Sequence, residues 1–219
     1  MILRRFASFA IVAFTSATVA AADPVQNWQT AFPREGVANQ SIYFRARYVD
    51  ASGREHRQEV WREGSTRLRR VSDDRLDLIV ERDADGEYQY RLADRERHIM
   101  VLADRTSLYR AGIFSDWEGL AYALSEPRTH YELTTSGGAP DRSGIAPCVW
   151  TTMTTPVSRI CWSRGWGLPL SIETRRGDDW ITQFAITEVR IFEPSDAVFQ
   201  IDPAGYVEMD TRAGDDLAD

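Results

Sequence analysis

Two cysteines, Cys148 and Cys161, are the only ones in the 219-residue chain, and a turn-like Thr-Thr-Pro at 154–156 lies midway between them. An antiparallel hairpin centred on 154–155 would place Cys148 directly opposite Cys161. Residues opposite each other in such a pair lie about 4.5–5.5 Å apart at Cα, within the range that a disulfide bridges. The spacing therefore predicts a disulfide-linked hairpin in a β-rich domain. The same register sets Val149 against Ile160 and Trp150 against Arg159.

The N-terminal segment has the pattern of a secretory signal peptide. Arg4 and Arg5 precede an apolar run from Phe6 to Val19, and three alanines follow at 20–22. A charged start, an apolar centre and a small-residue cleavage site predict a signal peptide over 1–22 and a mature protein in the periplasm, where disulfides persist. The alternative, a cytosolic protein with two reduced cysteines, requires another explanation of this segment. No later run reaches the ~18 apolar residues of a membrane-spanning helix.

The mature chain is acidic. Residues 1–22 contain two arginines and no acids, so the remaining chain has 24 basic and 33 acidic residues, a formal charge of 24 − 33 = −9. This balance argues against a nucleic-acid partner, because such binding relies on neutralising phosphates. The length suits one domain over 23–210. The acidic segment 211–219 predicts a disordered tail.

Strand-like alternation dominates the chain, which predicts a mainly β fold of the α+β type. The clearest example runs from Leu76 to Glu81, with an Asp-Ala-Asp-Gly turn at 83–86 leading into the next strand. Further strands are expected at 42–48, 87–92, 98–103, 129–135, 168–175 and 179–192, with two more within 55–72. A final segment, 197–210, closes the fold.

Two helical segments interrupt the strands. A short N-terminal helix is expected within 23–37, with Asp23 as its cap and Gly36 as its stop. The internal segment begins with Ser115 and Glu118, the spacing of a capping box. Trp117, Leu120 and Leu124 then form one apolar stripe, which predicts a helix packed on the sheet.

The sequence contains no recognisable catalytic constellation. His56, His98 and His130 lie in three separate segments, and no metal, nucleotide or hydrolase motif is present. We therefore expect a binding protein rather than an enzyme, with no cofactor and no metal site. A hydrolase whose site the sequence does not reveal stays open as a further alternative.

Aromatic and aliphatic residues on the alternating strands, together with the internal helix, form the candidate binding site. Two interpretations stay open: a closed core filled by these side chains, or a hollow lined by them that receives an acyl chain. The candidate residues are Ile42, Phe44, Tyr48, Leu78, Val80, Tyr88, Tyr90, Trp117, Leu120, Leu124, Leu170 and Ile172.

The arginines between 54 and 75 alternate with acidic residues, which is typical of a solvated sheet face. The sharper interpretation is a rim that meets an acidic partner or lipid head groups.

The order of these segments, together with the stretches CVWTTMTTPVSRICWSRGWGLPLSIETRRGDDW and VFQIDPAGYVEMD, resembles the LolA/LolB-like superfamily of periplasmic and outer-membrane lipoprotein carriers. The resemblance covers most of residues 25–210. It implies a curved antiparallel sheet of about 10–11 strands, an incomplete barrel covered by the N-terminal helix and the internal helical insert. Two features depart from the family: the Pro of an Arg-Pro pair is missing at Leu68-Arg69-Arg70-Val71, and the lipid-anchoring cysteine is absent.

The resemblance implies a periplasmic protein that holds acyl chains of lipids or lipoproteins in an apolar hollow between sheet and helices, as a carrier or sensor. The alternative is a non-enzymatic regulatory module of the cell envelope that binds a partner protein through the same fold.

Overall fold

The computed structural model describes residues 23–25, 27–110, 116–139 and 144–212. The predicted signal peptide and residues 213–219 of the predicted tail lie outside this part of the chain. Within it, the helices are α1 (Trp28–Ala31), α2 (Arg105–Arg110) and α3 (Trp117–Tyr122), with one 3-10 turn, η1 (Asp196–Phe199). The strands are β1 (Asp23–Val25), β2 (Ser41–Val49), β3 (Glu55–Glu63), β4 (Arg67–Ser72), β5 (Leu76–Arg82), β6 (Tyr88–Asp94), β7 (Ile99–Asp104), β8 (Leu133–Ala139), β9 (Cys148–Thr154), β10 (Val157–Ser163), β11 (Leu168–Arg176), β12 (Asp179–Ile191) and β13 (Val207–Asp210).

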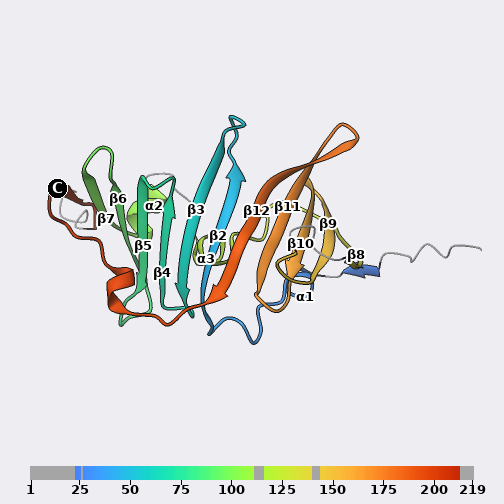
Figure 1. Cartoon of the computed structure of the whole chain (residues 1–219), viewed down its shortest axis with the longest axis horizontal. Helices are drawn as coiled ribbons and strands as arrows, with labels where there is room; N and C mark the ends of the chain where they lie inside the picture. Colours follow the sequence, from blue (N-terminus) through green and yellow to red (C-terminus); the bar gives the residue numbers. More distant parts are fainter. Residues whose placement is uncertain (1–22, 26, 111–115, 140–143, 213–219) are drawn as a thin grey trace, which may run out of the picture.

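The described strands form one thirteen-stranded sheet in the order β1-β8-β9-β10-β11-β12-β2-β3-β4-β5-β6-β7-β13 (Figure 1). It is not closed, because β1 and β13 are its edges. Two runs of consecutive antiparallel strands, β2–β7 and β8–β12, meet where β12 pairs with β2. The sheet is mainly β and open, as predicted, but larger than the expected 10–11 strands.

The last strand also departs from the antiparallel expectation, since β13 pairs with β7 in parallel. After β12 the chain passes η1 and crosses the end of the sheet before it reaches the β7 edge (Figure 1). That long return brings β13 in along the direction of β7 rather than against it. Thr211 still donates its backbone N–H to Leu102, so pairing continues one residue past the predicted end at 210.

The predicted disulfide between Cys148 and Cys161 is confirmed, but the predicted hairpin register is wrong by two residues. Thr155 and Pro156 form the loop, and Cys161 lies opposite Trp150. The predicted register would place Pro156 within the ladder, where its missing N–H weakens pairing. A two-residue shift keeps every side chain on its face, so the cysteines bridge diagonally with Cα atoms 5.4 Å apart. Val149 faces Trp162 instead of Ile160, while Arg159 still lies over the Trp150 ring at 4.9 Å.

The N-terminal helix is shorter than predicted. Asp23 and Gly36 do not bound it: Asp23 belongs to β1, which pairs with β8, and Gly36 lies in a turn beyond the helix. The cap is Asn27, whose side chain accepts a hydrogen bond from the Thr30 N–H at 2.8 Å. The edge of β8 offers backbone partners to 23–25, and this pairing replaces the first turn of the expected helix.

The internal helix α3 begins one residue later than predicted. Ser115 lies outside the described residues, and Asp116 is the cap, accepting from the Gly119 N–H at 2.5 Å. Glu118 forms an ion pair with Arg34 at 2.6 Å. Ala123, in the left-handed region at φ 53°, ends the helix. No helix in the described part of the chain is long and apolar enough to cross a bilayer.

The sheet has two distinct faces. We call the face that carries the main apolar cluster the inner face; Ile42, Phe44 and Val80 on it are fully buried. The opposite, outer face of β4 and β5 packs against η1, where Phe199 is buried. There Asp77, which is 1% exposed, accepts hydrogen bonds from Arg69 at 2.6 and 2.9 Å.

Candidate functional site

Eleven of the twelve candidate residues belong to one apolar cluster on the inner face. Leu124 is the exception: it lies past the end of α3 and packs on a second cluster around Trp28 and Phe32. Ile172 contacts both clusters. Sequence alternation therefore identified which strand residues share a face, because the side chains of a strand alternate strictly between its two faces. The eleven residues are Ile42, Phe44, Tyr48, Leu78, Val80, Tyr88, Tyr90, Trp117, Leu120, Leu170 and Ile172.

The pairing of the strands aligns inner-face residues into rows that cross the sheet. We call one of these the Phe44 row. It starts on β2 and ends on β13, and its neighbours are directly paired at each step. Its members in order are Phe44, Val60, Arg70, Leu78, Leu92, Val101 and Met209.

The Phe44 row is buried at its β2 end and exposed near its β13 end, with Val101 partly buried between Leu92 and Met209. Phe44 and Val60 are fully buried, whereas Leu92 is 37% and Met209 is 51% exposed. In the adjacent row Leu76 and Val207 are exposed on the same side, with Asp94 and Ile99 between them. We call this region the open end of the inner face; it comprises Leu76, Leu78, Leu92, Ile99, Val101, Val207 and Met209 on β5, β6, β7 and β13.

The open end is an unusual surface for a folded protein. Eight large hydrophobic side chains are exposed among the described residues, and four of them lie here. Single exposed hydrophobic residues are normal, but a contiguous apolar patch marks an interaction or ligand surface. The other four are dispersed over α2, the β9–β10 hairpin and β12.

Residues of α3 pack against the inner-face cluster near the start of β6, away from Leu92. Trp117 stacks on Tyr88 of β6, with ring centroids 4.9 Å apart and an interplanar angle of 10°. Leu120 and Ala121 are buried in the same cluster. Two candidate residues, Tyr48 and Leu170, line a separate hollow of about 390 Å³ between β2, β11 and β12. Its lining includes Arg47, Glu55 and Glu173 and is therefore mixed rather than apolar.

A buried arginine fixes α3 to the sheet. Arg62 of β3 is fully buried and donates to the backbone carbonyls of Ala121 at 3.1 Å and Val37 at 3.4 Å. Burial lowers the pKa of Arg62 to about 10. Arg62 and Arg34 each lie 4.3 Å from the Tyr122 ring centre. The solvated face expected for residues 54–75 is therefore wrong at Arg62. The only sequence signal for its burial is that Arg62 lies two residues after Val60 on the same strand, so both side chains point to the same face.

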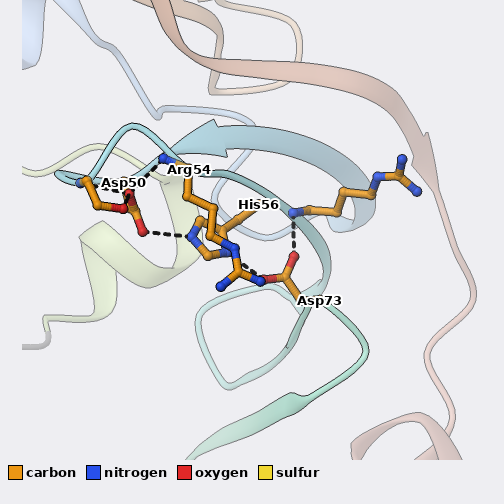
Figure 2. A network of polar contacts seen from close by, with 6 residues as sticks. Asp50, Arg54, His56 and Asp73 are labelled. Carbon is orange, nitrogen blue, oxygen red and sulfur yellow. Dashed lines mark hydrogen bonds and ion pairs between the residues drawn. The ribbon is translucent and has the colours of Figure 1, made fainter.

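A second polar cluster lies at the ends of β2 and β3 (Figure 2). His56 sits between two carboxylates: Nδ1 lies 2.5 Å from Asp73 and Nε2 lies 2.9 Å from Asp50. These hydrogen bonds, that of Asp73 first, raise the pKa of His56, and the one to Asp73 lowers the pKa of that carboxyl. The pKa of Asp50 is lowered by the Ser52 hydroxyl first and by His56 second. The imidazole also stacks on Tyr48, with centroids 5.0 Å apart.

Both nitrogens of His56 are engaged, so the imidazole has no free lone pair with which to act as a general base or bind a metal. The arrangement holds together the turns that follow β2 and β4. His98 and His130 lie elsewhere, both exposed. Among the described residues, no group of three or more His, Cys, Asp and Glu side chains is arranged to hold a metal ion.

No family model and no curated protein matches the sequence. Among solved structures, the chain is similar to MucB in the crystal structure of MucB in complex with MucA(peri). The two share 17% identity at a TM-score of 0.39, over 74% of this chain and 55% of the MucB chain. The chain thus spans about half the length of MucB, and a likeness at this level assigns it neither a family nor a role.

Proposed function

We propose that this protein is a non-enzymatic periplasmic binding protein that holds acyl chains of lipids or lipoproteins on the inner face of its sheet. The observation that carries the proposal is the continuity of that face. The buried cluster around Phe44 includes Leu68 of β4 and Val80 of β5, and the partly buried Leu78 joins it to the exposed apolar residues of the open end.

An acyl chain suits this surface chemically. Each methylene transferred from water to an apolar surface contributes about 0.8 kcal/mol. The open end presents Leu, Ile, Val and Met side chains and no aromatic residue, so it offers many weak contacts and little directional specificity. In this proposal α1 and α3 cover the closed part of the face, and the ligand covers the remainder.

The periplasmic location is part of the proposal. The buried Cys148–Cys161 disulfide supports it, because structural disulfides persist in oxidising compartments. The signal-peptide pattern of 1–22 stays a prediction.

A second candidate is the envelope interaction module, favoured by the edge position of β13. Its residues are all exposed, and among the described strands it pairs only with β7. A free strand edge beside an apolar patch can accept a strand from a partner protein.

Displacement of a hydrophobic fluorophore tests the first candidate. The folded wild-type protein should take up the fluorophore, and lipid extraction of periplasmic material should release an acyl lipid. Leu92→Glu, in the open end, should abolish uptake because the new charge would have to be desolvated.

Ile181→Glu is the matched control, because Ile181 is 40% exposed, much like Leu92, but lies on β12 far from the open end. It should bind as the wild type does. Equal loss in both variants, or a wild type that takes up no fluorophore and releases no lipid, would contradict the acyl-binding proposal and favour the interaction module.

A further inference from the structure

One arginine interrupts the apolar Phe44 row. Arg70 of β4 pairs with Val60 on one side and with Leu78 on the other, so its side chain shares their inner face. It stands at the boundary between the closed part of the row and the open end. Burial lowers the pKa of Arg70 below its usual value, opposed only by the Tyr48 phenol.

Within the described part of the chain Arg70 has no hydrogen bond and no ion pair, in contrast with its neighbours on β4. Arg67 donates to Glu63 and Asp196, and Arg69 donates to Asp77 and to the Val198 carbonyl. Both of these face outward. Arg70 is half-buried, so its guanidinium, which carries five donors, has reduced contact with water and no protein partner among the described residues.

The other charged groups of the inner face near Arg70 are already engaged. Arg62 donates to two backbone carbonyls. Asp94 is the one acidic residue of β3–β7 that the strand pairing places on the inner face. It accepts hydrogen bonds from Arg75 and from the N–H groups of Glu96 and Arg97 at the end of β6. Arg70 is thus a cation whose counter-charge is not supplied by the described residues around it.

We propose that Arg70 binds the carboxylate of a long-chain fatty acid whose acyl chain lies across the open end. This rests on the proposed function and adds the head-group chemistry to it. A carboxylate matches the planar guanidinium fork with two parallel hydrogen bonds.

The dimensions agree with this ligand. From Arg70 on β4 to Met209 on β13 there are four strand spacings of about 4.8 Å, or roughly 19 Å in total. One acyl chain spans half of a bilayer core that is about 30 Å thick, or roughly 15 Å. A fatty acid anchored at Arg70 would therefore cover Leu78, Leu92 and Val101 and end near β7, one strand short of the β13 edge.

The test compares three ligands of equal chain length, palmitate, hexadecanol and hexadecyl phosphate, as competitors of the fluorophore. Wild-type protein should bind palmitate most tightly. Arg70→Met keeps the length of the side chain and removes its charge, and it should weaken palmitate binding by about tenfold to a hundredfold, the range for loss of a charge-assisted hydrogen bond. Its hexadecanol affinity should be unchanged. Arg47→Met, on the outward-facing, exposed side of β2, is the control and should leave all three affinities unchanged.

Equal palmitate affinity in the wild type and Arg70→Met would overturn the role of Arg70, as would equal wild-type affinity for palmitate and hexadecanol. Both results leave the acyl-binding function intact. Tighter binding of hexadecyl phosphate would overturn the carboxylate assignment. If the wild type binds none of the three ligands, both proposals fail. A urea melt of Arg70→Met checks that the variant is folded.

Discussion

The guanidinium carbon of Arg62 lies 4.3 Å from the centre of the Tyr122 ring, so a charge on the sheet and an aromatic ring on α3 meet inside the core. Both residues are buried. Arg34 approaches the same ring and also donates to the Leu124 carbonyl at 3.0 Å. Two cations and the backbone at the end of α3 thus form one unit, although the helix itself has only six residues.

Replacing Arg62 by Met should lower the free energy of unfolding by about 2–4 kcal/mol, because the Ala121 and Val37 carbonyls lose their buried donor. Urea unfolding measures this directly. The exposed Arg47→Met change should alter stability by less than about 0.5 kcal/mol. A neutral Arg62→Met would show that the buried charge offsets its own hydrogen bonds.

Stability should fall as the pH rises above neutrality because of His56. Its pKa is raised above 6.5 by Asp73 and Asp50, so its contribution is complete below that value and is lost as the pH passes through the raised pKa. The lowered pKa of Asp73 acts in the opposite direction, and its contribution is lost only in acid, below 3.8. Arg54 and Asp74 border the same site.

Urea midpoints of the wild type should therefore decline between about pH 6 and about pH 9, and His56→Gln should flatten that decline. The same slope in His56→Gln and in the wild type would assign the pH dependence to another group. His130→Gln, at an exposed position away from this cluster, is the control and should retain the wild-type slope.

The disulfide should stabilise the fold by about 3 kcal/mol, as expected for a loop of this length. Thiol titration of the unreduced, unfolded protein should detect no free thiol. A reducing agent should lower the urea midpoint of the wild type but not that of a Cys148→Ala/Cys161→Ala variant. Sensitivity of that double variant to the reducing agent would show an effect unrelated to the bridge.

Two substitutions separate the cap of α3 from its packing. Asp116→Ala removes the acceptor of the Gly119 N–H and should cost about 1 kcal/mol of stability. Leu120→Ala opens the buried cluster and should cost about 2–5 kcal/mol. Urea unfolding of both variants measures the two losses, and we expect the larger loss for Leu120→Ala. A neutral Leu120→Ala would mean that α3 does not contribute to the core.

The sequence predicted which face of the sheet a side chain occupies better than it predicted where helices begin and how the hairpin is paired. Alternation placed Phe44, Leu78 and Tyr90 on one side, because strand geometry leaves only two choices for each side chain. The hairpin register and the caps at Asn27 and Asp116 depend on single turn residues and on competing partners, which local pattern does not reveal.

The two inner arginines show a different limit. Arg62 and Arg70 look like members of a solvated arginine-rich stretch, since residues 54–75 alternate charges throughout. Arg62 lies two residues from Val60 and Arg70 two residues from Leu68, so strand alternation places both arginines on the inner face. Sequence analysis alone gives more weight to their charge and assigns them to the solvent-exposed face. Pairing across β3, β4 and β5 is what places them among apolar neighbours.

The junction of β12 with β2 has a consequence for the order of folding. Each antiparallel run, β2–β7 and β8–β12, joins strands that are near in sequence, whereas β2 ends at Val49 and β12 begins at Asp179. Closing a loop of about 130 residues loses far more chain entropy than closing a tight hairpin. The runs can therefore form early from local contacts, and their union is the slow step. Until that step, the hydrogen-bonding edges of β2 and β12 both stay open, and at these edges the folding chain is most exposed to aggregation.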